Sequence, residues 1–281
     1  MIFRSTDNPV NGFQLPITEF VAASVKGERK GKTQCEDAWS CESLGDICVV
    51  VVCDGAGSAS HAKEGAVIAS GIATKYLKRY IQSNKITDFS DIDTWENIIQ
   101  QTISHARSVV KRIIKYNDST IHNYHATLIG TIFSKKGGIF FHIGDGAAIA
   151  CADTENWDKC IVSPPKNGLY INQTYFYTEN NWEAQLRLTP FGPSKLITLF
   201  SDGVEYCLLD EDGKSINVPF ATVIDQHFVN CNPDQCAIDL ADTLQQDLNI
   251  LKSSDDDKTI LWMKLTGGEQ NELLPRMAQR K

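Results

Sequence analysis

Three continuous apolar stretches of this chain stop within two residues of an aspartate. They are Ile47–Cys53 before Asp54, Ile139–Ile143 before Asp145, and Leu196–Phe200 before Asp202. A short run of this kind is typical of a strand that is buried on both faces. One aspartate beside a glycine after a strand is ordinary turn chemistry. Three such strand ends together indicate carboxylates that gather at one edge of a sheet.

The remaining sequence predicts antiparallel sheets with helices grouped apart from the strands. Further strands are expected at Ile17–Val25, about Thr127–Phe133, Ala147–Cys151 and Thr259–Leu265. Apolar residues at helical spacing predict one helix over 66–81, Asp93 is expected to cap a second, and Asn232-Pro233 to open a third. Grouped helices and hairpin-joined strands favour an α+β fold. We expect one domain over residues 1–281, with its core at about 17–265 and a polar tail at 266–281.

Charge and cysteine content limit the partners. Lys and Arg total 27 against 35 Asp and Glu, a formal net charge of -8. This argues against a nucleic-acid partner, because such proteins usually carry a basic stripe. No signal peptide and no membrane-spanning run is apparent, so no membrane partner is expected. The nine cysteines are scattered and form no C-x-x-C motif or Cys/His cluster. That pattern favours reduced thiols in a cytoplasmic protein over a disulfide scaffold or a zinc site.

The strand-end carboxylates are typical of a site for hard divalent cations. Glu36-Asp37 and Asp255-Asp256-Asp257 add further acidic groups next to strands. Clustered carboxylates repel one another, and Mg²⁺ or Mn²⁺ supplies the compensating charge through oxygen ligands. Two such ions about 4 Å apart can activate a water and screen a phosphoryl group. Residues 27–33 resemble a P-loop but have one residue too few between their glycines.

Six short motifs, in their order along the chain, resemble those of the metal-dependent Ser/Thr protein phosphatases of type 2C. They are Cys35-Glu36-Asp37, Val52-Cys53-Asp54-Gly55-Ala56-Gly57-Ser58, His125-Ala126-Thr127-Leu128, Gly144-Asp145-Gly146, Phe200-Ser201-Asp202-Gly203-Val204 and Asp256-Asp257-Lys258-Thr259. Together they cover about residues 20–265, and their spelling is similar to the divergent, mostly bacterial branch of the family. The resemblance implies a four-layer α-β-β-α sandwich, with two central antiparallel sheets flanked by helix pairs and metals at one end between the sheets.

The resemblance also implies a role for each matching residue. Asp54 would bridge two metal ions, and Asp202 and Asp256 would complete one of the two sites. The carbonyl of Gly55 and the side chain of Glu36, through a water, would serve the other site. The remaining implied roles are those of Asp37, which would hold a metal-bound water, and Asp145, which matches the aspartate of a third, weaker metal site.

Four positions depart from the pattern of the family. Lys32 lies where relatives carry a phosphate-binding Arg, and a lysine meets phosphate without the bidentate fork. Ala56 replaces a His that some members use as general acid, and His61 nearby is expected to face solvent. Gly146 replaces a Ser. Asp257 replaces an Asn and is expected to add a negative charge beside the metal ligand.

The implied function is hydrolysis of phosphoserine and phosphothreonine on proteins by a water or hydroxide that bridges two Mn²⁺ or Mg²⁺ ions. The partners would be a phosphorylated protein and a cognate Ser/Thr kinase of bacterial signalling, and a monomer is expected. Two alternatives stay open: a pseudophosphatase or phosphoprotein-binding module without turnover, and a monoesterase for small phosphates. The aromatic residues of segment 152–190 would form either a recognition surface or packing beneath a long loop; they are Tyr170, Tyr175, Phe176, Tyr177 and Trp182.

Overall fold

Two antiparallel sheets of six strands each form the centre of the computed structural model, which describes residues 2–6, 9–28, 33–86, 88–168, 174–246 and 254–266. The first sheet runs in the order β1 (Ile2–Arg4), β4 (Ala38–Leu44), β5 (Ile47–Cys53), β6 (Leu128–Ser134), β7 (Gly137–Ile143) and β10 (Arg187–Phe191). The second runs in the order β2 (Asn11–Gln14), β3 (Thr18–Val25), β12 (Lys258–Leu265), β11 (Leu196–Phe200), β8 (Ala147–Cys151) and β9 (Cys160–Ser163).

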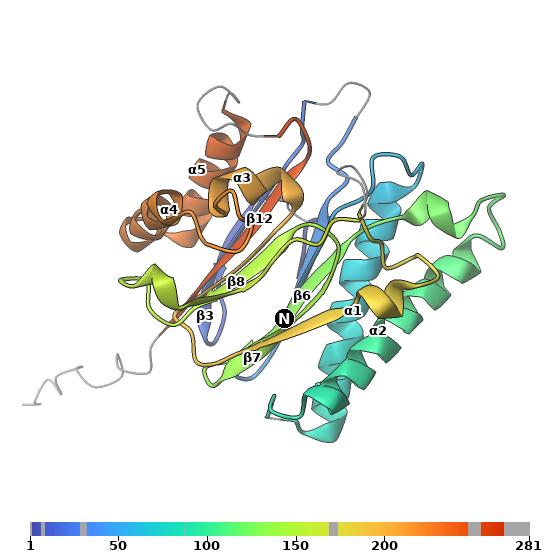
Figure 1. Cartoon of the computed structure of the whole chain (residues 1–281), viewed down its shortest axis with the longest axis horizontal. Coiled ribbons are helices and arrows are strands. Elements are labelled where there is room, and N and C mark those ends of the chain that lie inside the picture. The colour runs from blue at the N-terminus through green and yellow to red at the C-terminus, as the bar shows by residue number, and fades with distance from the viewer. Residues whose placement is uncertain are drawn as a thin grey trace, which may run out of the picture.

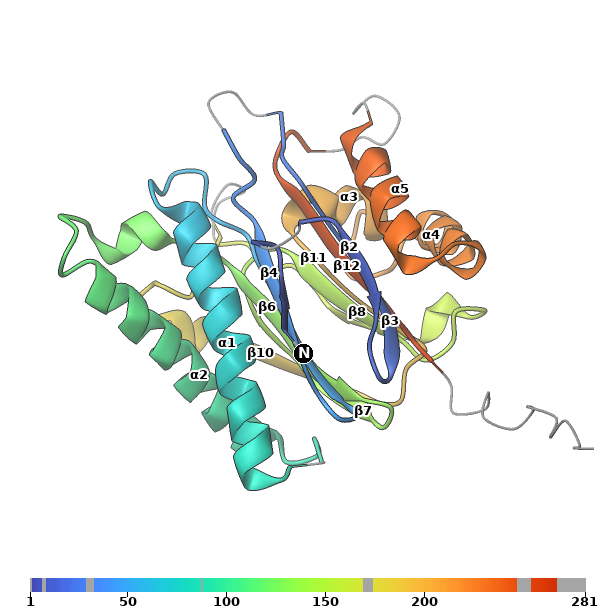
Figure 2. The ribbon, with the colours of Figure 1, turned by 180° about the vertical axis from the view of Figure 1, so that it is seen from behind.

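Helices cover the outer face of each sheet (Figures 1 and 2). The first sheet carries α1 (Ala62–Asn84) and α2 (Ile92–Ile113), and the second carries α3 (Glu205–Leu208), α4 (Val218–Asn230) and α5 (Pro233–Gln245). The layers are therefore helix, sheet, sheet, helix, and the expected α-β-β-α sandwich is confirmed.

The position of β5 between two buried layers explains why its sequence is apolar throughout. Val49, Val51 and Cys53 pack towards α1 and α2, whereas Val50 and Val52 pack between the sheets. Side chains alternate between the two faces of a strand, so a strand with a buried layer on each side favours apolar residues at every position. The strand ends at Cys53, so the next residue, Asp54, lies at the rim of the interface between the sheets.

The helix ends follow local capping chemistry, with one correction. α2 begins at Ile92 and is capped by Asp91, whose side chain accepts a hydrogen bond from the Thr94 backbone N–H at 3.1 Å. The prediction of Asp93 as cap is wrong, because the helix begins at Ile92 and Asp93 already lies in its first turn. Asn232 caps α5 as predicted, accepting from the Gln235 backbone N–H at 2.9 Å.

Residues 152–190 contain more structure than their sequence indicates. They hold β9 and the start of β10, and an isolated bridge pairs Asn167 with Thr174 where a hairpin at 174–177 was expected. Tyr177 and Trp182 are buried in the core beneath α2. Packing is thus the role of these two rings. Tyr170 lies outside the described residues.

Cys151 and Cys160 form a disulfide. They are the last residue of β8 and the first of β9, and they are direct cross-strand partners. The expectation that all nine cysteines are reduced thiols is wrong for this pair. Their register depends on the turn between the two strands, which carries no clear sequence signal. The other seven cysteines are free thiols.

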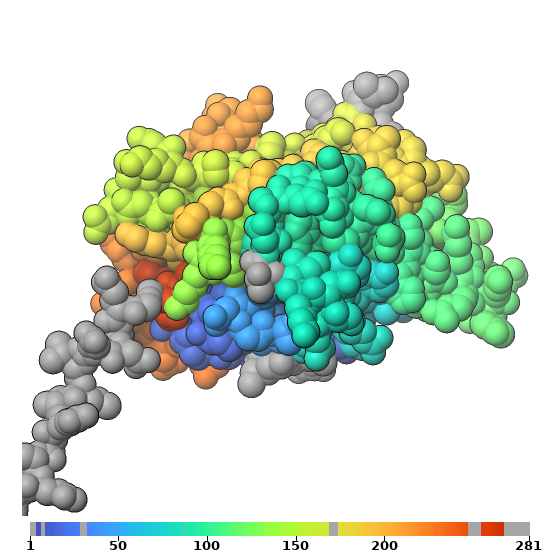
Figure 3. Space-filling model, turned by 90° about the horizontal axis from the view of Figure 1, so that it is seen from below, coloured from blue at the N-terminus to red at the C-terminus, as the bar shows by residue number. Residues whose placement is uncertain are grey.

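No helix in the described part of the chain is sufficiently long and apolar to span a membrane. At the end of the sandwich where α1 finishes, the β6–β7 turn (green) lies beside the segment that joins α1 to α2 (teal) (Figure 3). The other end of α1, around Ala62, lies beside the strand ends that carry the acidic residues.

Candidate metal centre

The structure brings the three strand-end aspartates together. Asp54 follows β5 of the first sheet, Asp202 follows β11 of the second, and Asp145 lies in the turn from β7 to β8, where the chain passes between the sheets. One carboxylate oxygen of each lies within 4.8 Å of those of the other two. The separation suits donor atoms that share one or two ions.

These carboxylates line an open cavity of about 630 Å³, which we call the acidic cavity. Its acidic lining residues are Asp54, Asp145, Asp202, Glu205 and Asp256. Asp256 comes from the turn before β12, so the predicted ligand of the last motif faces the same space as the strand-end aspartates. No Lys or Arg is among the described residues that line the cavity.

Burial and mutual repulsion make the ionised carboxylates costly. The pKa of Asp202 is raised to about 8, first by burial and then by the charges of Asp145 and Asp256. The pKa of Asp54 is raised well above its usual value, first by burial and then by Asp37 and Asp202. A divalent cation would reverse both effects, since it favours the charged form of every ligand.

The free oxygen atoms provide a test of whether Mg²⁺ or Mn²⁺ fits. Asp145 Oδ1 and Asp202 Oδ1 are buried, and neither accepts a hydrogen bond from any residue in the described ranges. A buried carboxylate oxygen without a donor is unfavourable unless another group satisfies it. The donor set is made of oxygen atoms alone, which suits a hard cation such as Mg²⁺ or Mn²⁺.

Asp37 is fully buried and is not among the residues that line the cavity. Its Oδ2 accepts a hydrogen bond from Ser201 Oγ at 2.7 Å, and its backbone carbonyl accepts one from Lys63 Nζ. Its pKa is raised to about 6, first by burial and then by the charge of Asp257. Asp37 Oδ1 accepts no hydrogen bond within the described chain, which leaves it able to hold a water.

Gly55 and Glu36 are close through their backbones. Gly55 forms a β-bridge with Ala126, and a Cβ added to it would lie 2.8 Å from the carbonyl oxygen of Glu36. Only glycine permits this approach. The Glu36 side chain is half-buried, and it lies outside both the group of three aspartates and the lining of the acidic cavity. The structure thus brings the Gly55 backbone to the segment that carries Glu36.

Asp257 lies next to Asp37, and its charge raises the pKa of that carboxyl. It is buried, its Oδ1 accepts from the Gly27 backbone N–H at 2.8 Å, and its Oδ2 accepts from the Glu36 backbone N–H at 2.6 Å. It does not line the acidic cavity. The carboxylate therefore fastens the segment that carries Glu36 and Asp37, and both of its oxygens are used as acceptors.

The departure at Gly146 has a steric cause. A Cβ at this position would lie 2.4 Å from Ile129 Cδ1 and 2.5 Å from the carbonyl oxygen of Phe200. The turn that presents Asp145 is packed directly against β6 and β11, so there is no room for the serine of the family motif. The glycine thus matches the close approach of the two sheets in this chain.

Sequence reasoning missed three residues around this site. Glu205 lines the acidic cavity, and its pKa is raised by burial and by Asp145. Arg187 donates hydrogen bonds from Nη2 to the carbonyls of Gly144 at 3.3 Å and Pro164 at 3.0 Å, and so holds the turn of Asp145. Lys63 is the third. Glu205 directly follows the S-D-G-V motif, and this proximity was the only available signal.

Of the candidates for phosphate binding and proton transfer, the structure describes His61 alone and places it outside the cavity. Lys32 lies outside the described residues. His61 precedes α1, stacks on the Tyr124 ring at a centroid distance of 5.0 Å and does not line the acidic cavity. Ala56 does line it, as does Phe176 of the aromatic segment. Phe176 therefore has a surface available for substrate, whereas Tyr177 beside it does not.

One further correction concerns soft metal ligands. His227, Cys231 and Cys236 lie together at the junction of α4 and α5, although the sequence was interpreted as having no Cys/His cluster. Their spacing spans a helix end, a turn and a helix start, and it matches no standard zinc motif.

Comparison with known proteins agrees with the fold and with the motifs. Residues 26–245 match the family described as Protein phosphatase 2C. Serine/threonine-protein phosphatase 3 of Escherichia coli (strain K12) is 27% identical over 222 residues, which cover 76% of this chain and 83% of that protein. Among solved structures, serine-threonine phosphatase 2C from Toxoplasma gondii has a TM-score of 0.65 at 12% identity, covering 95% of this chain and 99% of that one.

A second solved structure is the catalytic domain of serine threonine protein phosphatase PstP in complex with 2 manganese ions. It has a TM-score of 0.57 at 12% identity, covering 89% of this chain and 99% of that one. At such identities the structural matches speak for the fold alone, whereas the family match spans most of the sequence. The chain therefore belongs to the protein phosphatase 2C family of metal-dependent Ser/Thr protein phosphatases.

Proposed function

We propose that this chain removes phosphate from phosphoserine and phosphothreonine side chains of proteins with the help of two Mn²⁺ or Mg²⁺ ions. The observation that carries the proposal is the convergence of Asp54, Asp145 and Asp202 within 4.8 Å at the acidic cavity. Membership of the family supports the same reaction.

The ligand roles proposed for this chain follow the motifs. Asp54 would be shared by both ions, Asp202 and Asp256 would complete one site, and the Gly55 carbonyl and Glu36 the other. Asp145 would hold a third, weaker ion. When bound, these ions supply positive charge that lowers the pKa of a water nucleophile and screens the phosphoryl oxygens.

The protein's own groups would hold the nucleophile and admit the substrate. Asp37 Oδ1 is available as an acceptor for a water, and the hydrogen bond from Ser201 fixes the orientation of the carboxylate. Lys32 would contact the phosphate as a point charge. Phe176 and Tyr206 line the acidic cavity and offer apolar surface to the peptide around the phosphorylated residue.

A phosphoprotein is the substrate class that the electrostatics favour. The net charge is -8 and no Lys or Arg of the described residues lines the cavity, so a polyanionic nucleotide is repelled more strongly than a single phosphoester on a peptide. A Ser/Thr kinase would supply this substrate. We also propose that the chain acts as a cytoplasmic monomer in which residues 17–265 form the core of one domain.

The test compares substrates and metals on one preparation. Protein stripped of metal with a chelator should regain hydrolysis of phosphoserine and phosphothreonine peptides on addition of Mn²⁺ or Mg²⁺, and should act on them faster than on ATP. Asp54→Asn and Asp202→Asn should lose nearly all turnover, because each removes an ionised ligand. Asp118→Asn, at an exposed position outside the cavity, is the matched control.

Two results would contradict the proposal. Binding of phosphopeptide without turnover at any Mn²⁺ concentration would identify a pseudophosphatase. Faster hydrolysis of ATP or of small sugar phosphates than of peptides would identify a monoesterase for small molecules.

A further inference from the structure

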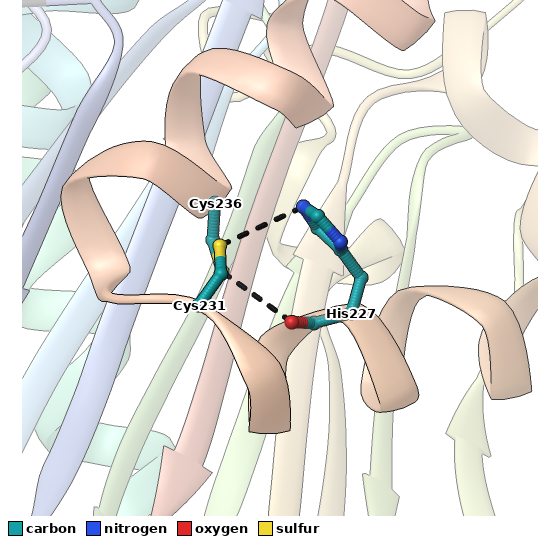
Figure 4. A group of neighbouring side chains, drawn as sticks. All are labelled: His227, Cys231 and Cys236. Carbon is teal, nitrogen blue, oxygen red and sulfur yellow. Dashed lines mark hydrogen bonds between the residues drawn. The ribbon is translucent and has the colours of Figure 1, made fainter.

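Four side chains of the types that can ligate metals lie at the junction of α4 and α5, outside the acidic cavity. His227 is in the last turn of α4, Cys231 follows that helix directly, and Cys236 and Asp239 lie in the first two turns of α5. None of the four lines the acidic cavity. Figure 4 shows the side chains of His227, Cys231 and Cys236 pointing towards one another across the corner between the helices.

The donor atoms lie at short mutual distances. Cys231 Sγ is 3.6 Å from His227 Nε2 and 2.8 Å from Cys236 Sγ, and His227 Nε2 is 2.7 Å from Asp239 Oδ2. Donors around a tetrahedral Zn²⁺ lie roughly 3.3–3.8 Å apart, given metal–ligand distances of about 2.0–2.3 Å. His227, Cys231 and Cys236 have donor atoms within 4.8 Å of one another, so these three need to widen by no more than about 1 Å to hold such an ion. Asp239 contacts the group through His227 and would have to move towards the sulfur atoms to become the fourth ligand.

We propose that His227, Cys231, Cys236 and Asp239 form a second metal site, for Zn²⁺ or another divalent ion that prefers thiolates, which joins the end of α4 to the start of α5.

The ligand types separate this site from the metal centre of the acidic cavity. Two thiolates and an imidazole favour a borderline or soft ion, whereas the acidic cavity offers oxygen atoms alone and suits a hard one. Mg²⁺ prefers oxygen ligands, so an excess of Mg²⁺ that fills the acidic cavity should not compete for the two thiolates. The two sites can therefore be loaded with different metals in one molecule.

Neighbouring groups hold two of the ligands in place. Gln235 Nε2 donates a hydrogen bond to Asp239 Oδ1 at 2.7 Å, which leaves Oδ2 directed at His227. Asn232 and Pro233 fix the tight start of α5, and so place Cys236 one turn from Cys231. Outer hydrogen bonds of this kind orient ligands in metalloproteins.

The site is accessible to ions from solvent. The side chains of His227 and Asp239 are 48% and 36% exposed, whereas Cys236 is buried. An apolar cavity of about 290 Å³ between α4, α5 and the second sheet reaches the same three residues. A metal at this corner would hold the two helices together at the mouth of that cavity.

A disulfide between Cys231 and Cys236 is the competing arrangement. The structure bonds Cys151 to Cys160 and leaves Cys231 and Cys236 as separate thiols. A disulfide would also give no role to the convergence of His227 and Asp239 on the same point. The experiment is therefore carried out on protein that is fully reduced with a phosphine.

The test uses Co²⁺ as a spectroscopic probe in a large excess of Mg²⁺. Reduced protein should bind one equivalent of Co²⁺ with a thiolate-to-metal charge-transfer band and the visible bands of tetrahedral Co²⁺, and Zn²⁺ should bleach both. Cys231→Ser, His227→Gln and Asp239→Asn should each weaken binding at least about tenfold. Their circular dichroism should match that of the parent, because these three residues are at least partly exposed.

Two controls keep the result specific. His105→Gln replaces an exposed histidine of α2 and should leave the Co²⁺ spectrum unchanged. Asp54→Asn should also leave it unchanged, although this variant loses phosphatase activity, so the two proposals fail independently. Zn²⁺ should raise the melting temperature of the parent and not that of Cys231→Ser.

The proposal is overturned if reduced protein shows no charge-transfer band with Co²⁺, or if the band survives in both Cys231→Ser and His227→Gln. It is also overturned if the reduced thiols bind Co²⁺ no more tightly than the Cys231→Ser variant does.

Discussion

Ser201 Oγ donates a hydrogen bond to Asp37 Oδ2 at 2.7 Å and accepts one from the Thr259 backbone N–H at 2.9 Å. One hydroxyl thus joins the segment before β4 to the end of β11 and the start of β12. Asp37 is fully buried, so this bond is a main source of stabilisation for its charged form. The relationship makes Ser201 a positioning residue for Asp37.

We predict that Ser201→Ala raises the pKa of Asp37 above its present value of about 6, because the charged form loses a donor. The acidic limb of the pH–activity profile should move to higher pH, and the free energy of unfolding should fall by about 1–3 kcal/mol. The profile and urea denaturation measure the two effects. Ser108→Ala, at an exposed hydroxyl on α2, is the control. An unmoved profile would show that Asp37 is not tuned through this bond.

Asp202→Asn should stabilise the metal-free protein while it abolishes metal-dependent activity. In the folded state the pKa of Asp202 is raised to about 8 by burial and by neighbouring aspartates, against about 3.9 in an unfolded chain. The folded state therefore retains a proton that the unfolded chain has lost. The free energy of unfolding of metal-free protein should then fall as pH rises from about 4 to about 8.

Thermal melting with chelator across this pH range measures the effect. Asp202→Asn should flatten the slope, and saturating Mn²⁺ should remove it from the parent protein. The exposed Asp118→Asn should leave the slope as it is. A melting temperature that is equally pH-dependent in Asp202→Asn would contradict the prediction.

Gly146→Ser, which introduces the residue of the family motif, should destabilise this chain. The added Cβ would meet the Phe200 carbonyl oxygen at 2.5 Å, and overpacking of this kind costs about 1–3 kcal/mol. Gly192→Ser is the matched control, since nothing lies within 4 Å of a Cβ there. Chemical denaturation of both variants compares the two sites. Equal stability would mean that the sheets can separate locally at no cost.

Asp257→Asn should also destabilise, although asparagine is the residue of the family motif. Both oxygens of Asp257 accept backbone N–H groups, those of Gly27 and Glu36. An amide offers one acceptor oxygen, so its NH₂ group would face an N–H group. The loss should be about 1–3 kcal/mol in urea denaturation. A neutral result would show that a water or a rotated side chain replaces the lost acceptor.

The apolar pattern was sufficient to predict the central strands, and it was insufficient where polar residues are buried. β5 is apolar at every position and β11 at every position but Thr198, so their burial can be recognised from sequence alone. β4 (AWSCESL) was not recognised, because Glu42 in it is buried and forms an ion pair with Lys78 at 2.8 Å. Only the three-dimensional pairing removes the cost of that charge.

The candidate site divides in the same way. The positions of Asp54, Asp145 and Asp202 follow from the ends of apolar runs, since a strand that stops places the next residue at the rim. The place of Asp257 depends on the backbone N–H groups of Gly27 and Glu36, which are distant from it in the sequence and donate to its two oxygens. Likewise, the approach of Cys231 to Cys236 depends on how tightly α5 starts after α4. Local sequence pattern carries no information on either.

The three aspartates of the acidic cavity belong to different layers of the sandwich: Asp54 to the first sheet, Asp202 to the second, and Asp145 to the crossover between them. The candidate metal centre therefore depends on both sheets. A fragment with only one sheet would keep only part of the ligand set. Proteolytic cleavage that separates the two sheets should therefore abolish activity, even where each half stays folded.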